Sequence, residues 1–256
     1  MVYGLGVHRF YVPPEQCDQP VLTLPEREAW HAQRVLRVVP GQQVTVLDGQ
    51  GHQFSCQVAE VSRKAVRLAV LDAKTVPLLP YSLTLVQAVP RGKVFDTIVQ
   101  KATELATSRI VPLLSARVTV RLDQAQVQSK LAHWRQTAIE AMKQCGWPWL
   151  PRIEPPQTLA EFLARHEPFD LAVVGCLQPG SRHLGGIVRQ FYLQRGRRPQ
   201  TLAAWIGPEG DFTPEELAAI QAAGAQPTSL GPTVLRTDTA AVYCLAVLSC
   251  ELQAPD

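Results

Sequence analysis

Two short segments near the end of the chain combine glycine and proline with charged side chains, a composition suited to holding a ligand. The first is Gly207-Pro208-Glu209-Gly210, and the second spans residues 230–240 and includes Arg236. Each follows an apolar run of strand length, and open α/β sheets bind their ligands beyond the carboxyl ends of such strands. Either segment alone could be an ordinary turn between a strand and a helix, but the two together predict a binding site.

The usual phosphate-binding glycine motifs are missing from the sequence. The chain has neither a G-x-G-x-x-G fingerprint after a strand nor a G-x-x-x-x-G-K-[ST] loop, in which glycines bring backbone amides close to phosphate groups. A generic Rossmann enzyme is therefore a poor interpretation, and we expect a different way of holding the ligand.

Helix signals follow both segments. Thr213 is suited to cap a helix, Pro214 suits the first helical position, and Glu216 completes a capping box. The second segment leads into a last helix with four apolar residues on one face: Ala241, Leu245, Leu248 and Leu252. Both loops are thus predicted to run from a strand into a helix.

The chain divides into two regions of different pattern. Residues 1–74 predict a small β-barrel, and prolines in residues 76–80 indicate a linker. From residue 82 to residue 256 strands alternate with helices, which predicts an α/β domain with a parallel sheet. In the first region we expect strands at 43–47, 53–61 and 65–71, a turn at 49–51 and a helix at 26–36. In the second we expect strands at 83–89, 110–114, 171–176, 202–206 and 228–230, and helices at 94–105, 124–144, 159–165, 184–193, 214–223 and 239–252.

Composition limits the class of protein further. With 256 residues, of which 46% are hydrophobic, the chain can bury a real core in one large domain or two modest ones. No apolar run reaches the roughly 18 residues of a membrane span, and the start lacks the layout of a signal peptide, so we expect a cytoplasmic protein. The six cysteines and six histidines show no metal-ligand spacing, and we expect neither a metal nor a membrane partner.

The charge is small overall but uneven along the chain. The formal net charge is +3, yet residues 73–153 carry eleven Lys and Arg against four Asp and Glu, whereas residues 154–256 carry seven against eleven. A basic middle section suggests a surface that meets a polyanion. An ordinary solvated face explains the same charges equally well.

Several motifs match one known family in order along nearly the whole chain. Near the C-terminus the matching segments are Gly-Pro-Glu-Gly-Asp-Phe at residues 207–212, Leu230-Gly231, Val234-Leu235-Arg236 and Thr237-Asp238-Thr239-Ala240. Earlier in the chain they are residues 8–12, His31 with residues 34–37, and Lys93, Asp96 and residues 100–105. Together they resemble the RNA small-subunit methyltransferase E family, which belongs to the SPOUT class of knotted enzymes that use S-adenosylmethionine.

The resemblance implies an architecture and a reaction. It implies an N-terminal PUA-like barrel that helps to bind RNA, and a C-terminal SPOUT domain whose parallel sheet carries helices on both faces and whose last segment threads into a trefoil knot. It implies a homodimer that methylates N3 of one uridine in 16S ribosomal RNA, acting on the 30S subunit. The cofactor-binding residues implied are Gly207, Pro208, Glu209, Gly210, Leu230, Gly231, Leu235, Arg236, Thr239 and Ala240.

Roles for single residues follow from the same resemblance and from charge. Arg236 is the first catalytic candidate, because a fixed cation beside uracil would stabilise its N3-deprotonated form. It could instead pair with Asp238 or with a helix terminus. Glu209 is the second, as a group that orients the substrate or assists proton transfer, or as a simple carboxylate near a helix start. The candidate RNA contacts are Arg9, His31, Arg34, Arg37 and Arg117, with Arg34 and Arg37 expected on one helix face.

Two departures from the family pattern keep other functions open. Asp211 stands where the family usually has a second glycine, and Asp238 where it usually has glutamate. A non-catalytic RNA-binding or ribosome-binding protein that lost its cofactor would fit these changes, as would a SPOUT methyltransferase with another RNA target. The matches at residues 8–12 and 31–37 argue against the latter, since they belong to the substrate-binding part of the family.

Overall fold

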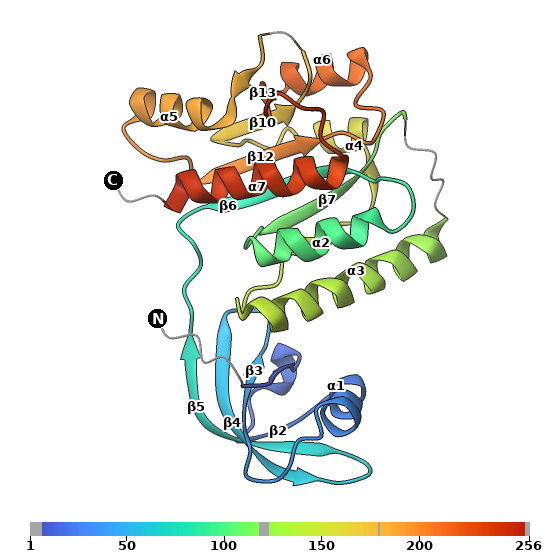
Figure 1. Cartoon of the computed structure of the whole chain (residues 1–256), viewed down its shortest axis with the longest axis vertical. Coiled ribbons are helices and arrows are strands. Elements are labelled where there is room, and N and C mark those ends of the chain that lie inside the picture. The colour runs from blue at the N-terminus through green and yellow to red at the C-terminus, as the bar shows by residue number, and fades with distance from the viewer. Residues whose placement is uncertain (1–6, 118–122, 179, 254–256) are drawn as a thin grey trace. The chain divides into compact units, whose positions relative to one another are not determined.

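The computed structural model describes residues 7–117, 123–178 and 180–253, and it separates into two compact units (Figure 1). Unit 1 contains the chain up to Leu78 together with Ile139–Leu150, and unit 2 contains Leu79–Ala138 and the chain from Pro151 onwards. The break after Leu78 falls within the linker predicted at residues 76–80. The sequence did not predict that residues 139–150 belong to unit 1. The helical pattern over residues 124–144 is continuous and does not indicate that the helix is shared between the two units.

Unit 1 is built on a five-stranded sheet in the order β1-β3-β4-β5-β2. β1 is parallel to β3, and every other neighbouring pair is antiparallel. The strands β3, β4 and β5 confirm the three that were predicted, whereas β1 and β2 are too short for an alternating pattern to reveal. The elements are β1 (Arg9–Tyr11), η1 (Pro14–Gln16), β2 (Val21–Thr23), β3 (Gln43–Leu47), β4 (His52–Val61) and β5 (Val66–Thr75).

The predicted turn between β3 and β4 is confirmed, and it depends on glycine. Gly49 and Gly51 have φ angles of 77° and 96°, which residues with a side chain rarely adopt. A Cβ atom on Gly51 would also collide with the ring of Trp149. The indole N–H of Trp149 in turn donates to the Val76 carbonyl oxygen at 2.9 Å, so the turn seats one end of the segment 139–150.

The predicted helix at residues 26–36 exists but is not uniform. α1 (Glu26–Trp30) runs directly into a π-helical turn, η2 (His31–Val35). The expectation that Arg34 and Arg37 share a helix face is wrong, because Arg37 lies beyond the helix with a φ of 51°. It occupies the left-handed position that ends many helices.

A buried ion pair fixes the end of the long helix α3 (Gln124–Cys145) within unit 1. Lys143 Nζ lies 2.7 Å from Glu28 Oε1, and Glu28 Oε2 accepts the Tyr11 backbone N–H at 3.2 Å. Removing one member of such a pair leaves a buried charge without compensation and typically costs about 3–5 kcal/mol. The pair therefore holds residues 139–145 against the core of unit 1, to which Phe10, Leu22 and Leu68 contribute.

Unit 2 confirms the predicted parallel sheet. Its strands lie in the order β11-β13-β10-β12-β6-β7-β8, with β9 also pairing with β7, and every described pairing is parallel. The strand predicted at residues 228–230 begins earlier, since Pro227 at its centre obscures the pattern. The strands are β6 (Ser82–Ala88), β7 (Arg109–Leu114), β8 (Arg152–Ile153), β9 (Gln157–Thr158), β10 (Leu171–Gly175), β11 (Arg182–His183), β12 (Thr201–Ile206) and β13 (Ala225–Ser229).

Helices cover both faces of this sheet. α4 and α6 pack on one face, where Phe162, Leu217 and Ile220 join a core with alternate strand residues such as Val174 and Trp205. α2, α5 and α7 lie together on the other face, with α7 in contact with both of its neighbours (Figure 1). The helices are α2 (Val94–Glu104), α4 (Leu159–Leu163), α5 (Leu184–Arg195), α6 (Pro214–Ala222) and α7 (Thr237–Gln253).

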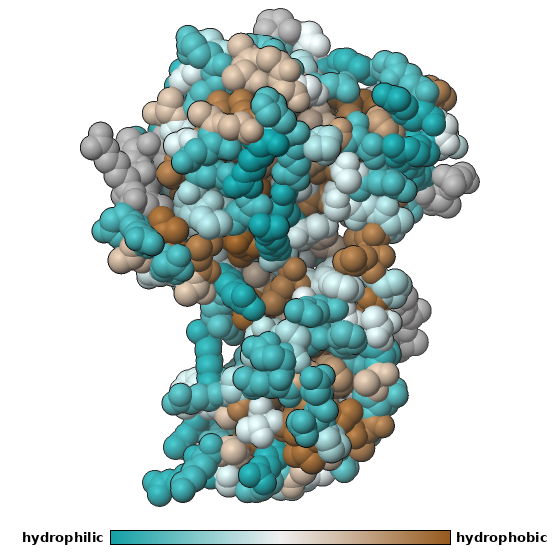
Figure 2. All heavy atoms as spheres, turned by 180° about the vertical axis from the view of Figure 1, so that it is seen from behind, coloured by the Kyte–Doolittle hydropathy of each residue, from teal (hydrophilic) through white to brown (hydrophobic). Residues whose placement is uncertain are grey.

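Eleven large hydrophobic residues are exposed among those that the structure describes. On the face that Figure 2 shows, hydrophilic side chains cover most of the area, and hydrophobic ones gather in smaller groups. Three exposed apolar side chains matter for the argument below: Trp30 and Val35 in unit 1, and Val234 in unit 2. Within the described residues, no helix has the length and hydrophobicity needed to cross a membrane.

Candidate active site

A cavity of about 730 Å³ lies beyond the carboxyl ends of three parallel strands of unit 2. Its walls are the segments that follow β10, β12 and β13, together with the start of α7. This is the position at which open parallel sheets bind ligands, and its volume falls within the range of small-molecule pockets. The two loops singled out in the sequence therefore face one cavity.

Most of the predicted cofactor residues line this cavity, and two do not. The lining residues among them are Gly207, Pro208, Glu209, Leu230, Gly231, Leu235, Arg236 and Ala240, whereas Gly210 and Thr239 lie outside the lining. Sequence reasoning missed the third wall, which includes Gly175, Cys176 and Ser181 after β10. The strand predicted at residues 171–176 contained the signal, because the same rule about carboxyl ends applies to it.

A buried hydrogen-bond chain joins the two predicted loops beneath the cavity. Gln87, at the end of β6, is fully buried, and its Nε2 donates to Thr237 Oγ1 at 2.9 Å. Thr237 Oγ1 then donates to the Gly207 carbonyl oxygen at 2.6 Å. Because Thr237 is the first residue of α7, this chain fixes the distance between the Gly207 loop and Arg236, the residue before the helix.

The loop at residues 207–213 is held by its own hydrogen bonds. Asp211 adopts the left-handed conformation with a φ of 62°, and its backbone N–H donates to the Pro208 carbonyl oxygen at 2.9 Å. Asp211 Oδ1 accepts the Phe212 N–H at 2.7 Å. The predicted capping box follows, with Thr213 and Glu216 exchanging side-chain to backbone bonds at 3.2 and 2.9 Å.

Two neighbouring loops also fasten this loop. Glu209 Oε1 accepts the backbone N–H of Arg91, in the segment after β6, at 3.1 Å. Arg117, in the segment after β7, donates from Nη1 to the Gly210 carbonyl oxygen. Arg117 was predicted as an RNA contact, and in the structure its guanidinium donates to the loop at residues 207–213.

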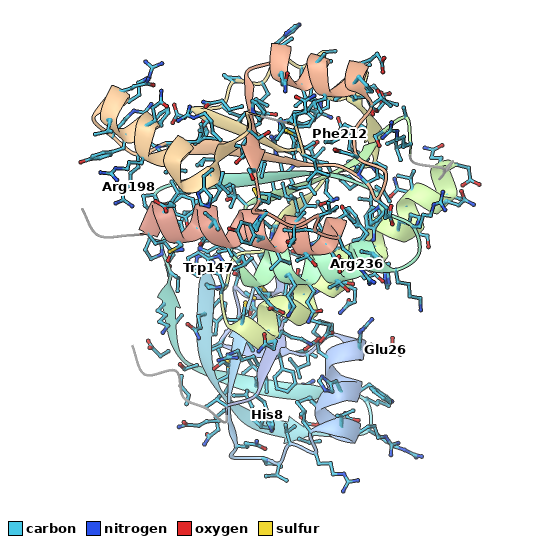
Figure 3. The ribbon with its side chains drawn as sticks, turned by 45° about the horizontal axis from the view of Figure 1, so that its top comes forward. His8, Glu26, Trp147, Arg198, Phe212 and Arg236 are labelled. Atoms are coloured by element: carbon cyan, nitrogen blue, oxygen red, sulfur yellow. The ribbon has the colours of Figure 1, made fainter. Side chains whose placement is uncertain are left out.

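Arg236 is the one cationic side chain among the described residues that line the cavity. It lies immediately before α7 (Figure 3) and is exposed. Within residues 7–117, 123–178 and 180–253 its guanidinium makes no hydrogen bond or ion pair, so the alternative in which it pairs with Asp238 is not observed. Its charge is available to a ligand.

The strongly paired carboxylates of unit 2 lie outside the cavity. Two N–H groups of Arg197 bind Asp170 at 2.8 and 2.9 Å and hold the pKa of that carboxyl well below its usual range. For Glu154 burial alone would raise the pKa, but hydrogen bonds from Arg165 and Gln157 lower it overall. Because these charges already have partners, we assign both a structural role. No group of three possible metal ligands occurs in the described part of the chain.

The predicted RNA contacts of unit 1 differ in exposure and in whether their side chains bond to other residues. The Arg9 guanidinium donates to the carbonyl oxygens of Lys143 and Gln144 at 3.1 and 3.0 Å and so caps the end of α3. His31 is half-buried, whereas Arg34 and Arg37 are exposed. Sequence reasoning missed Trp30, whose 60% exposure is large for a tryptophan and which lies one turn before Arg34.

Comparison with known proteins gives the class to which this fold and site belong. Residues 77–249 match the RNA methyltransferase domain family, and residues 24–71 match the RNA methyltransferase PUA domain family. The protein is thus built like an RNA methyltransferase, with a PUA domain followed by an α/β SPOUT domain as predicted. The knot stays a prediction.

Similar proteins narrow the class to one family. A ribosomal RNA small subunit methyltransferase E from Synechocystis is 32% identical over 96% of this chain and 78% of its own length, and one from Mycobacterium bovis is 31% identical over 93% and 90%. A protein of Legionella pneumophila solved with the cofactor SAM bound has a TM-score of 0.84 at 30% identity, and the match covers 94% of this chain and 96% of that one. A ribosomal RNA small subunit methyltransferase E of Neisseria gonorrhoeae bound to S-adenosyl methionine has a TM-score of 0.81 at 27% identity over 94% and 96%. The chain belongs to the ribosomal RNA small subunit methyltransferase E family.

Proposed function

We propose that the protein transfers the methyl group of S-adenosylmethionine to N3 of a uridine in 16S ribosomal RNA of the small ribosomal subunit. The observation that carries the proposal is the cavity of about 730 Å³ whose walls bear residues 207–210 and 230–237. Two similar solved structures hold this cofactor, and their chains are covered almost completely.

The reaction transfers a methyl group to N3 and a proton away from N3, so two bonds break and two bonds form. The S–CH₃ bond of the sulfonium breaks, its electron pair stays on sulfur, and the methyl carbon bonds to N3 of the uracil. The N3 proton leaves to water or to a base. The cofactor supplies the electrophile, so the protein's contribution is to align sulfur, methyl and N3 and to favour loss of the proton.

We assign to Arg236 the role of stabilising the negative charge that develops on the uracil. Loss of the N3 proton leaves negative charge on the uracil, and a preorganised cation beside it lowers the barrier. The guanidinium at the cavity wall is exposed and has no partner among the described residues, which supports this role. We assign Glu209 to positioning instead, because one of its oxygens already binds the Arg91 N–H.

The uracil N3 edge is used in base pairing, so the target nucleotide must be unpaired or turned out of its stack. Unit 1 offers a surface suited to such RNA, formed by Trp30, Arg34 and Val35 and called here the Trp30 surface. All three side chains are exposed. An aromatic ring beside a free guanidinium is the combination that stacks a base and contacts a phosphate. Arg37 and His31 adjoin it in sequence.

Substitution of Trp30 and Arg34 tests this surface. Trp30→Ala should weaken binding of 16S RNA by about 1–3 kcal/mol, the typical worth of one base stacked on an aromatic ring, and Trp30→Phe should retain most of the affinity. Arg34→Ala should reduce the slope of log K against log salt by about 1, since it removes one phosphate contact. Fluorescence anisotropy with labelled RNA across a salt series measures both, and wild-type affinity in Trp30→Ala would remove the ring from the RNA interface.

Methyl transfer from labelled S-adenosylmethionine to 30S subunits lacking native modification tests the function itself. N3-methyluridine in the 16S RNA, identified by mass, is the expected product. Cofactor binding without transfer would indicate another RNA target, and the absence of both would favour a non-catalytic RNA-binding protein. The proposal includes a homodimer acting in the cytoplasm, where 30S subunits are; analytical ultracentrifugation of the full chain tests the dimer.

A further inference from the structure

The charged side chains that line the cavity are predominantly acidic. The described residues that line it include three carboxylates, Glu209, Asp211 and Asp238, and one guanidinium, that of Arg236, and the other described lining residues are uncharged. The cavity therefore presents a formal charge of −2 to a ligand. Such a lining favours a cationic ligand over a neutral one of the same shape, because the protein charges act at short range in a partly enclosed site.

The three carboxylates differ in exposure and in the groups that offset their charge. Glu209 is exposed and accepts the Arg91 N–H, and Asp238 lies in the first turn of α7, where the helix N-terminus offsets its charge. Asp211 is partly buried, and its Oδ1 accepts the neighbouring Phe212 N–H. Its other oxygen has no hydrogen-bond or ion-pair partner among the residues that the structure describes.

Contacts place the Asp211 carboxylate against the start of the loop that lines the cavity. A Cβ atom built on Gly207 would lie only 2.9 Å from Asp211 Oδ1, so the carboxylate rests directly against Gly207. The Gly207 carbonyl oxygen accepts the Thr237 hydroxyl at 2.6 Å, and Thr237 is bonded to Arg236 in the chain. Asp211 packs against Gly207, and Arg236 is bonded to Thr237 in the chain, so both adjoin the Thr237–Gly207 hydrogen bond. This arrangement suits a cationic sulfur beside one residue and an anionic base beside the other.

We propose that Asp211 makes the cavity discriminate by charge, so that it binds the cationic sulfonium cofactor more tightly than the neutral thioether left after methyl transfer. The inference rests on the proposed function. The two molecules differ by one methyl group and one positive charge on sulfur, so shape separates them weakly, whereas a nearby carboxylate acts on the charge alone. Asp211 is then a specificity-determining residue. Its attraction to the cofactor is lost when the methyl group is transferred and the sulfur becomes neutral, which favours replacement of the product by a new cofactor molecule.

Two substitutions remove the charge and are compatible with the backbone conformation at residue 211. Asn and Gly both tolerate the left-handed conformation at residue 211, and Asn keeps an Oδ1 that can accept the Phe212 N–H. The matched control is Glu215→Gln, which removes an equal charge four residues further on, from an exposed side chain outside the cavity lining. The probes are S-adenosylmethionine and S-adenosylhomocysteine, titrated by calorimetry into the full-length protein.

The quantity measured is the Kd for S-adenosylhomocysteine divided by the Kd for S-adenosylmethionine. This ratio should fall about tenfold in both Asp211→Asn and Asp211→Gly, equivalent to ~1.4 kcal/mol, and should stay at the wild-type value in Glu215→Gln. An unchanged ratio in Asp211→Asn, with S-adenosylmethionine still bound, overturns the inference and leaves the proposed function intact. A similar fall in Glu215→Gln also overturns it, because the preference would then come from overall charge. Failure of the wild-type protein to bind either probe overturns the proposed function and the inference together.

Discussion

The two loops that face the cavity differ in how firmly the protein holds them. The loop at residues 207–213 is fastened by Asp211 and the capping box from within, and by Arg91 and Arg117 from neighbouring loops. The loop at residues 230–236 is joined to Ser229, at the end of β13, by two weak bonds: the Gly231 N–H donates to Ser229 Oγ at 3.3 Å, and Ser229 Oγ donates to the Gly231 carbonyl oxygen at 3.4 Å. The Val234 side chain in this loop is 78% exposed. The loop is held firmly at its end, where the Thr237 hydroxyl donates a hydrogen bond to the Gly207 carbonyl oxygen.

This difference suits two tasks in one reaction. A cofactor with fixed shape is best held by a preorganised wall, because less order must be imposed when it binds. A loop that meets a large RNA gains from side chains that are free to adjust to it. We infer that residues 207–213 form the cofactor wall and that residues 232–236 face the substrate, with the Gln87–Thr237–Gly207 chain keeping the two in register.

The largest effect on turnover is expected from removing the Arg236 charge from the loop at residues 230–236. Arg236→Ala should lower turnover by roughly 10²–10³-fold, the typical loss when one preorganised group that stabilises transition-state charge is removed. The Kd for S-adenosylmethionine should change by less than about fivefold, since Arg236 serves the uracil and the fastened loop holds the cofactor. Single-turnover kinetics and calorimetry measure the two quantities separately.

Arg189→Ala is the matched control for this experiment, because Arg189 is an exposed arginine on α5 outside the cavity lining. Its turnover should equal that of the wild type. If Arg236→Ala instead weakened cofactor binding and left turnover at saturation unchanged, the division of tasks between the loops would be reversed.

A smaller effect is expected from adding one carbon to the fastened loop. A Cβ atom at Gly207 would lie 2.9 Å from Asp211 Oδ1 and 3.1 Å from the Phe212 backbone nitrogen, so the loop must shift. We expect Gly207→Ala to lower the free energy of unfolding by about 1–3 kcal/mol, the usual cost of overpacking, and to weaken cofactor binding about tenfold. Chemical denaturation and calorimetry provide the readings.

Gly210→Ala tests the same loop without the collision. A Cβ atom at Gly210 would meet only the flexible Arg117 side chain, at 3.4 Å, so its stability should stay within about 0.5 kcal/mol of the wild type. Equal losses in the free energy of unfolding in Gly207→Ala and Gly210→Ala would contradict the view that contact with Asp211 makes glycine necessary at residue 207.

The sequence predicted the architecture well where patterns were long. The alternation of strands and helices from residue 82 onwards indicated the parallel sheet, and the capping box at Thr213 located the start of α6. Strands of two or three residues, such as β8 and β11, left no periodic signal. The strand at residues 225–229 was shifted in the prediction because Pro227 is unusual inside a sheet.

The candidate site was predicted in part, and the gaps have physical causes. Glycine and proline motifs located two walls of the cavity, but the wall after β10 carries ordinary residues such as Leu177 and Gln178. The positive φ at Asp211 shows why glycine can serve at that position, which the sequence alone could not reveal. Likewise, the bonds from Arg9 to the end of α3 and from Arg117 to Gly210 join residues that are far apart in the chain, so their charges alone suggested only RNA binding.

The smallest expected effect tests whether the fastened loop takes part in proton transfer. Glu209→Gln keeps a carbonyl oxygen that can accept the Arg91 N–H, so the link between the loops should survive. If Glu209 only positions the loop, turnover should fall by less than about threefold. A group that removes the N3 proton contributes far more, typically 10²–10⁴-fold. Single-turnover rates for Glu209→Gln and Glu209→Ala separate the roles: a hundredfold loss in both variants would make Glu209 the proton acceptor, whereas a near-normal rate in Gln with a larger loss in Ala would leave the chemistry to Arg236 and the support of the wall to Glu209.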